Sequence, residues 1–343
     1  MSFVVVQAHI LRYKAWYMGF GFAAFLVLLS LFLTPTDHLP VVWAARIELA
    51  GGSAYGPEMD ALFHEYWDEP FASAGFAYPL TAIWFGLPIA FLPDVLLNMV
   101  ACVICLGSVG LGLHLLRMPV ALVLFAPVLW GIQFIQLTTC LMGLTLIAIW
   151  AARERRWWLM IILLVLISAT KPQTTLLPGL FLALYALRAG HWKPLLIIGA
   201  VVISLPFALE PDWVTKWIAS AQRYTNAIPA FWHYYFLPIG LWFLWKRHWW
   251  AGIAISQIAL FPMLFHPYVL SPLILAYIPL KSNRFAWFMV ACSWCVLLLP
   301  FIMPYWLTLT LSYIVPICIC YYLKNIREEA EQPSSLAAIG TEV

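Results

Sequence analysis

Charge is what this 343-residue chain has least of. Only 10% of its residues are charged, against about 25% in soluble globular proteins, while 64% are hydrophobic. Apolar runs of the length needed to cross ~30 Å of hydrocarbon recur along most of the chain. This composition excludes an ordinary soluble domain and predicts an all-α polytopic membrane protein.

Several signals of other protein classes are also missing. The first apolar run is too long for a signal peptide, and no small-residue cleavage site follows it. No repeat period and no Gly-rich phosphate loop are found. Two Cys-x-x-Cys spacings, Cys102/Cys105 and Cys292/Cys295, lie inside apolar runs, where cysteine usually acts as a small hydrophobe. Neither zinc nor a disulfide is therefore expected at these cysteines.

The basic residues predict how the chain crosses the membrane, because Lys and Arg concentrate in cytoplasmic turns. Fourteen of the 18 fall in alternate turns, and we expect these turns and both termini on the cytoplasmic side. The other four are expected in extracytoplasmic turns: Arg46, Lys171, Lys216 and Arg223. This alternation holds only if one apolar run does not cross.

The run predicted not to cross is 76–93. It is short for a span and is interrupted by Pro79, Pro88 and Pro93, and a proline inside a helix costs ~3 kcal/mol. We expect a juxtamembrane or re-entrant helix there. The twelve predicted spans are about 15–34, 95–116, 119–132, 137–152, 157–170, 173–188, 194–209, 231–245, 249–264, 267–280, 285–303 and 305–323.

These runs predict a single membrane-embedded domain over 1–323. Residues 35–94 are expected to form a structured first extracytoplasmic loop that contains juxtamembrane helices. Residues 324–343 are expected to form a polar, disordered cytoplasmic tail. Polar residues from distant parts of the chain then meet on the extracytoplasmic face. Ionisable groups near membrane depth are costly, so their convergence suggests a functional site.

Asp37 stands where the first apolar run ends. It could cap the helix expected from WAARIEL (43–49). It could instead act as a general base that takes the proton of an attacking hydroxyl. The two roles need different rotamers, and the sequence leaves both open.

Lys171 and three glutamines also admit two interpretations. Lys171 precedes Pro172, which ends the helix, and its ammonium could either snorkel to the interface or face a phosphate. Gln133, Gln136 and Gln173 could hydrogen-bond between helices or bind the hydroxyls of a polar substrate. Neither interpretation is favoured by the sequence.

The remaining extracytoplasmic candidates are less specific. His266 could be satisfied by a carbonyl or could contact substrate, and Arg223 and Asn226 lie in a loop that is either solvated or covers the site. The acidic stretch 58–69 matches no ligand spacing, so a solvated loop is favoured over a metal site. No metal ligand set is predicted, and the need for a divalent cation is left open.

Several motifs together resemble one enzyme family. Asp37 followed by WAARIELAGGSAYG (43–56) and FAYPLTAIWFGLPIAFLP (76–93) resembles the first outer loop of glycosyltransferase family 87. These are membrane enzymes of the GT-C superfamily that include polyprenyl-phosphate-mannose-dependent mannosyltransferases. The chain has one proline, in Tyr78-Pro79-Leu80, where the family has two. Further similar motifs are GIQFIQLTTCLMGL (131–144), SATKPQTTLLPGL (168–180) and HPYVLSPLILAYIP (266–279).

The resemblance covers roughly residues 15–280 and implies a GT-C-type bundle of about 12 transmembrane helices. It implies that Asp37 is the catalytic base and that Lys171 and His266 lie near the donor phosphate or sugar, where Gln173 and Arg223 are further candidates. Candidate acceptor or loop contacts are His38, Arg46, Tyr55, Tyr78, Gln133, Gln136, Asn226 and Tyr268.

The function so implied is an inverting hexosyl transfer for cell-envelope glycan synthesis. Mannose, or another hexose or pentose, would move from a polyprenyl-phosphate donor to a lipid- or glycan-linked hydroxyl. The reaction is expected on the extracytoplasmic face of a bacterial plasma membrane, with no nucleic-acid partner and no certain cofactor. The competing hypotheses are a lipid-linked sugar flippase or transporter, and an O-antigen-ligase- or polymerase-like enzyme.

Overall fold

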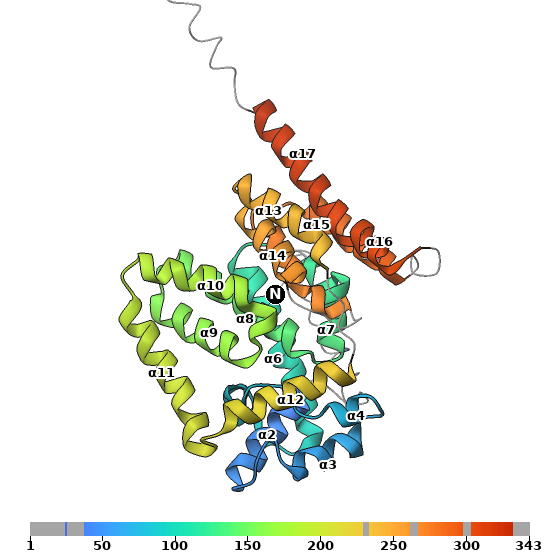
Figure 1. Ribbon diagram of the computed structural model, residues 1–343. Coiled ribbons are helices and arrows are strands. Elements are labelled where there is room, and N and C mark those ends of the chain that lie inside the picture. Colours follow the sequence, from blue (N-terminus) through green and yellow to red (C-terminus); the bar gives the residue numbers. More distant parts are fainter. Residues whose placement is uncertain (1–24, 26–37, 229–232, 261–266, 298–302, 332–343) are drawn as a thin grey trace, which may run out of the picture.

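The computed structural model describes residues 25, 38–228, 233–260, 267–297 and 303–331, and every regular element within these ranges is helical (Figure 1). Two expected site residues, Asp37 and His266, lie outside the described residues. The first predicted span, 15–34, lies almost wholly outside them as well.

The helices beyond residue 93 include α6 (Asp94–Leu115), α8 (Leu137–Arg153), α9 (Trp157–Thr170), α10 (Pro172–Arg188), α11 (Trp192–Leu209), α13 (Leu237–Trp245), α14 (Trp249–Leu260) and α15 (Asn283–Trp294). The first five begin and end within two residues of the predicted positions, whereas α13 begins six residues later and α15 ends nine residues earlier than predicted. The predicted span 267–280 is instead a 3-10 helix, η5 (Pro267–Tyr277). The last run continues from α16 (Tyr305–Leu309) through a π-helical turn into α17 (Val315–Glu331), so helix extends into the expected tail.

The predicted count of twelve spans is not what the described helices show. Three are long and apolar enough to cross a membrane: Leu96–Leu115, Trp192–Leu209 and Tyr305–Ile326. A fourth span results if α7 (Ala126–Gln133) and α8, bent by 119° at their junction, count as one. Several predicted spans are shorter helices. At 1.5 Å per residue the 14 residues of α9 extend about 21 Å, less than the ~30 Å hydrocarbon core.

Helices α6 and α8 pack side by side in the same direction. Ser108 of α6 donates to the carbonyl of Cys140 at 3.3 Å. One turn farther along both helices, a Cβ on Gly112 would lie 2.6 Å from that of Leu146. Because the helices are parallel, the chain between them must return along their length. That return uses η3 (Val120–Leu124) and α7.

One end of the bundle holds the turns before α9 and α11. Trp157, at the start of α9, stacks on His191, which precedes α11, with ring centroids 4.5 Å apart. Arg155 and Arg156 lie in the first of these turns, and Arg188 and Lys193 flank the second. Basic residues from two turns are thus brought together.

The α13–α14 turn lies at this same end, because α14 runs antiparallel to α10. Gln257, near the end of α14, bonds to the carbonyl of Gln173 at the start of α10, at 2.7 Å. Trp250, near the beginning of α14, contacts Phe181 farther along α10, with ring centroids 5.1 Å apart. Lys246 and Arg247 therefore lie toward the end of α10 that carries Arg188.

Tyr321 of α17 brings the last basic turns to this end. Its ring lies 4.7 Å from that of His248, and its hydroxyl donates to the carbonyl of Ala276 at 2.8 Å. Lys281 and Lys324 follow these two contacts closely in the chain. We call this the basic end of the bundle. The turns placed at this end are among the alternate turns in which the sequence concentrates Lys and Arg.

Four turns place a basic residue in the left-handed region that favours glycine. They are Arg117 (φ 56°), Arg155 (57°), Arg247 (60°) and Lys281 (46°). In the α8–α9 turn the N–H groups of Arg155 and Arg156 bond back to Ala152 and Ala151, which closes the end of α8 as a Schellman motif does. Glycine takes the equivalent position in the α10–α11 turn, at Gly190 (82°).

The opposite end of the bundle carries a second, smaller core. Figure 1 shows α2 (Leu39–Leu49), α3 (Pro57–Tyr66), α4 (Phe71–Ala74) and α12 (Trp213–Ala227) gathered there, in the lower part of the view. Leu39, Val42 and Trp43 of α2 bury against Phe76, Leu80 and Trp213. Apolar side chains thus hold the predicted first loop as a folded unit.

The run 76–93 forms three short helical pieces: η1 (Leu80–Ala82), α5 (Ile83–Gly86) and η2 (Leu87–Ile89). Their ten residues extend at most about 20 Å, which is too short to cross a bilayer. Arg46 of α2 fastens the end of this run, donating from Nε to the carbonyl of Ala90 and from Nη2 to that of Leu92, both at 2.8 Å.

Trp84 of α5 ties the run to the bundle. Pro206 in α11 has no N–H, so the carbonyl four residues earlier, on Val202, loses its helical donor. The Trp84 indole N–H donates to that carbonyl at 2.8 Å. A proline break in one helix thereby becomes the docking point for another element.

Candidate functional site

The strand-like segment before η1 is held by hydrogen bonds to its backbone. Trp217 and Ser220 of α12 donate to the carbonyls of Ala77 and Phe76, at 3.1 and 2.5 Å. Tyr55 donates to the carbonyl of Tyr78 at 2.9 Å. These contacts fix the backbone of Tyr78 from both sides, so the direction of its side chain is set by the fold.

Lys171 lies opposite Tyr78 at the junction between α9 and α10. Its backbone (φ −146°, ψ 75°) breaks the helix, because the following Pro172 disfavours a helical conformation in the residue before it. Lys171 Nζ donates to the Tyr78 hydroxyl at 3.2 Å. An ammonium group from the bundle and a phenol from the folded loop thus meet at one point.

An apolar cavity of about 600 Å³ opens beside this pair. Its wall comes from α9, α10, α11, α12 and the start of the 76–93 run, with Pro79 and Pro172 as the neighbours of Tyr78 and Lys171. Leu164, Leu180, Val202 and Trp217 represent the rest of the lining. We call this space the apolar groove. Its lining is mostly apolar, and Lys171 and Tyr78 are each the chain neighbour of a lining proline.

Two buried carboxyl groups, of Glu48 and Glu210, lie between the loop and the helices α11 and α12. Glu48, at the end of α2, accepts a hydrogen bond from the Ala54 N–H at 2.8 Å and is 5% exposed. Glu210, at the end of α11, is equally buried and accepts from Ser53 at 2.5 Å and from Lys216 at 2.6 Å. Burial, and then the negative charge of Glu210, raise the pKa of Glu48 to about 7. The pair joins the loop to α11 and α12.

Tyr55 connects the carboxyl pair to Tyr78. Burial, and then the charges of Glu210 and Glu48, raise its pKa above the ordinary value. It therefore stays a neutral phenol, able to donate to the Tyr78 carbonyl. The chain of contacts runs from the carboxyl pair through Tyr55 to the residue that faces Lys171.

Among the predicted site residues, Lys171, Tyr78 and Tyr55 are brought together. Arg46 makes the loop contact described above. His38 is buried at the N-cap position of α2, and its side chain forms no capping hydrogen bond. The capping role considered for Asp37 concerns a residue outside the described part of the chain.

No side-chain hydrogen bond among the described residues joins any of the three predicted glutamines to Lys171 or Tyr78. Gln133 is half-buried at the end of α7. Gln136 is buried at the N-cap of α8, and its side-chain oxygen has no hydrogen-bond donor among the described residues. The Gln173 side chain is exposed, and only its carbonyl is engaged, by Gln257.

Arg223 and Asn226 are exposed on α12, in the predicted outer loop. Arg223 pairs with Asp60 of α3 at 3.5 Å, which ties α12 to the loop rather than directing the guanidinium at Lys171. Tyr268 belongs to η5, and its side chain lies outside the part of the chain that the structure describes. The described residues contain no group of three His, Cys, Asp or Glu that could hold a metal ion.

Three buried, hydrogen-bonded polar side chains were missed by sequence reasoning: Glu48, Glu210 and Gln257. Glu48 reads as one more polar residue of an outer helix, and its burial depends on Glu210, far along the chain. A signal for Glu210 was present, because an acid directly after an 18-residue apolar helix is costly without a partner. Comparison with protein families, with characterised proteins and with solved structures found no match to this chain.

Proposed function

We propose that this protein is an inverting glycosyltransferase that takes its sugar from a polyprenyl-phosphate donor. One observation carries the proposal: the hydrogen-bonded pair of Lys171 and Tyr78 directly precedes, in the chain, Pro172 and Pro79, which line an apolar groove of about 600 Å³. A polyprenyl phosphate has this same division, with a long hydrocarbon tail and a single anionic head. The proposal assigns the tail to the groove and the phosphate to Lys171.

Membrane embedding is supported by helix α11. It is apolar along its length, yet only 6% of its span is buried inside the protein. Leu196, Ile197 and Val201 are each more than half exposed. Apolar side chains all around an exposed helix fit a hydrocarbon environment. Because α11 also lines the groove, a lipid could enter from the membrane.

Lys171 and Tyr78 supply the groups that a phosphate needs. Lysine binds phosphate as a point charge, and charge-assisted hydrogen bonds are stronger than neutral ones. Without a bound sugar donor, the Lys171 ammonium donates a hydrogen bond to the Tyr78 hydroxyl at 3.2 Å. When a phosphate arrives, both groups can donate to its oxygens and stabilise the charge of the leaving group.

The proposed chemistry is a single displacement. The acceptor hydroxyl gives its proton to the Asp37 carboxylate, and its oxygen forms a bond to the anomeric carbon. The bond between that carbon and the phosphate oxygen breaks, and the electron pair leaves with polyprenyl phosphate. The configuration at the anomeric carbon is inverted. Asp37 is the residue before His38, the N-cap of α2, and α2 contributes many residues to the loop core.

The orientation belongs to the proposal as well. Basic turns favour the cytoplasmic side, so the Lys171–Tyr78 pair, at the other end of α9, would face the extracytoplasmic side. A GT-C-type arrangement of about 12 crossings, with both termini cytoplasmic, completes it. The acceptor would be a lipid- or glycan-linked hydroxyl of the cell envelope.

The test is transfer of labelled sugar by the purified protein in liposomes, with synthetic polyprenyl-phosphate mannose and other polyprenyl-phosphate sugars as donors and a membrane lipid extract as acceptor. Loss of a general base typically costs 10²–10⁴-fold in rate, so we expect D37N to be at least ~100-fold slower. The matched control is D68N, an exposed acid of the same loop. Its activity should equal that of the unaltered protein.

Two outcomes would overturn the proposal. Full transfer by D37N would remove the general base. Movement of a fluorescent lipid-linked sugar across the liposome membrane, without any transfer product, would identify a flippase instead.

A further inference from the structure

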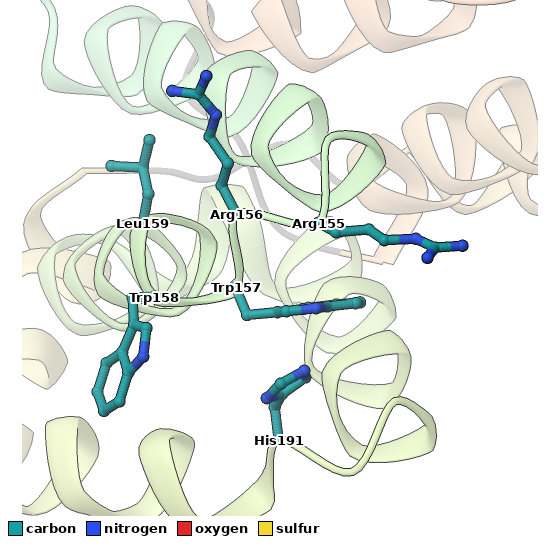
Figure 2. Close-up of a pocket in the computed structure, with 6 residues that line it drawn as sticks. All are labelled: Arg155, Arg156, Trp157, Trp158, Leu159 and His191. Atoms are coloured by element: carbon teal, nitrogen blue, oxygen red, sulfur yellow. The ribbon is translucent and has the colours of Figure 1, made fainter.

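A second cavity lies at the basic end of the bundle, at the far end of α9 from Lys171. Its volume is about 390 Å³, and it is lined by Arg155, Arg156, Trp157, Trp158, Leu159 and His191. Figure 2 shows these six side chains around the α8–α9 turn and the start of α11. The 14 residues of α9, about 21 Å in length, separate Arg156 of this cavity from Lys171.

The turn fixes how the two arginines are presented. Arg155 takes a left-handed conformation (φ 57°), and the closing hydrogen bonds of Arg155 and Arg156 to α8 hold the backbone on both sides. Figure 2 shows the two side chains leaving the turn in different directions. The Arg156 guanidinium lies 4.7 Å from the Trp150 ring centroid, so a cation–π contact holds it in place.

Arg155 and Arg156 form no ion pair with the acidic side chains that the structure describes. Both guanidinium groups are exposed, each with several donors arranged to fit phosphate oxygens. The cavity therefore carries two positive charges, which favour the binding of an anion.

The aromatic lining indicates where that anion comes from. The ring of Trp157 stacks on that of His191 with centroids 4.5 Å apart, and both rings line the cavity. Trp158 is 60% exposed, and Trp192 next to the cavity is 49% exposed. Tryptophan is enriched where a membrane meets water. Farther along the two helices, Ile162 of α9 and Leu196 and Ile197 of α11 are exposed. Acyl chains can lie along these apolar faces.

We infer that this cavity binds the phosphate of an anionic membrane phospholipid, and that Arg155 and Arg156 supply the positive charge that attracts it. The acyl chains lie along α9 and α11, and Trp157 and Trp158 lie at headgroup level. This inference rests on the membrane embedding of the proposed function and not on sugar transfer. The site would hold lipid even if D37N transferred sugar normally.

The test is native mass spectrometry of the full-length protein in detergent, titrated with phosphatidylglycerol and, separately, with phosphatidylcholine of the same acyl chains. We compare a double variant, R155G with R156A, against K246A with R247G. The control turn has the same construction: Lys246 lies over Trp245 at 4.7 Å, Arg247 is left-handed (φ 60°), and Trp249 follows. Glycine suits the left-handed position, so both variants keep their turns.

We expect the unaltered protein to retain phosphatidylglycerol in preference to phosphatidylcholine. The Arg155/Arg156 variant should bind phosphatidylglycerol about tenfold or more weakly, because two nearby positive charges are lost. The Lys246/Arg247 variant should bind it within about twofold of the unaltered protein. Inorganic phosphate at millimolar concentration should not displace the lipid.

Three results would overturn the inference. Equal loss of lipid in both variants would mean that total charge, and not this cavity, holds the lipid. No loss in the Arg155/Arg156 variant would show that these two charges do not hold the lipid. Displacement by inorganic phosphate would identify a site for a soluble phosphate compound instead.

Discussion

Lys171 donates a 3.2 Å hydrogen bond to the hydroxyl of Tyr78, although 93 positions separate the two residues. Lys171 belongs to the junction of α9 and α10, and Tyr78 belongs to the folded loop. The hydrogen bond therefore forms only when the loop is packed against the bundle. Both side chains are half-buried beside the apolar groove.

Replacing Lys171 by Met should reduce kcat/KM for a polyprenyl-phosphate donor by about 10–100-fold, because hydrogen bonds to charged groups contribute about 1.5–3 kcal/mol. Y78F should cost less, about tenfold at most, since it removes one neutral donor. K171R retains the charge and should keep most of the activity. Steady-state transfer assays measure each value. A K171M enzyme with unchanged kcat/KM would contradict the role of Lys171 in binding phosphate.

The carboxyl pair predicts how loop stability depends on pH. In the folded chain the pKa of Glu48 is raised from 4.5 to about 7, first by burial and then by Glu210. The folded state therefore binds the proton more tightly than the unfolded state. The stabilisation is complete below pH ~4.5 and is lost as pH rises toward 7, by up to about 3 kcal/mol. Lys216 opposes part of this shift and Tyr55 remains neutral.

Thermal unfolding in detergent between pH 4.5 and 8 measures this dependence. The Tm should fall across pH 5–7 in the unaltered protein, and E48Q should flatten that fall. E65Q, which removes an exposed acid of α3, serves as the control and should follow the unaltered curve. If E48Q shows the same fall as the unaltered protein, the dependence originates elsewhere.

Two buried glutamines predict opposite effects on stability. The Gln257 carboxamide lies within a turn of α10, accepting from the Leu177 N–H at 2.8 Å and donating to the Gln173 carbonyl at 2.7 Å. Q257L leaves both backbone groups without this partner and should cost about 1–3 kcal/mol. Q136L removes an oxygen that has no donor among the described residues, so it should be neutral or stabilising.

Chemical unfolding of the two variants, followed by helical circular dichroism, provides the comparison. A loss of sugar transfer in Q136L without a loss of stability would place Gln136 in the substrate site. Equal destabilisation of both variants would show that the Gln136 oxygen is also satisfied.

Helix positions were largely predictable from the sequence, because local signals mark them. The predicted bounds of α9, 157–170, are those observed, since Lys171-Pro172 stops the helix and the Arg153–Arg156 cluster marks its start. The predicted α10 differs by one residue, 173 against Pro172. Pro79, Pro88 and Pro93 likewise foretold that the 76–93 run would be broken.

The number of membrane crossings was not predictable in the same way. The prediction counted apolar runs, but crossing depends on helix length, and α13 and α14 have only 9 and 12 residues. Short helices inside a bundle are stabilised by neighbours that no local pattern reveals. The Gln257 contacts to α10 are an example, because they join residues 80 and 84 positions apart.

The candidate site was predictable only in part. Lys171 stood out because a charge next to a helix-breaking proline is unusual in an apolar chain. Tyr55 and Tyr78 were found through the resemblance of their motifs, and the structure connects them. Glu48 and Glu210 escaped notice, because the chemistry of each depends on the nearness of the other.

The left-handed basic residues have a consequence for how the chain is made. Glycine would adopt these conformations more easily, as it does at Gly190. Arg117, Arg155 and Arg247 each lie two residues beyond the end of a helix, and in the proposed orientation each also adds a charge that favours the cytoplasmic side. In that orientation, a substitution at one of these positions changes the end of a helix and the charge that directs membrane insertion at the same time.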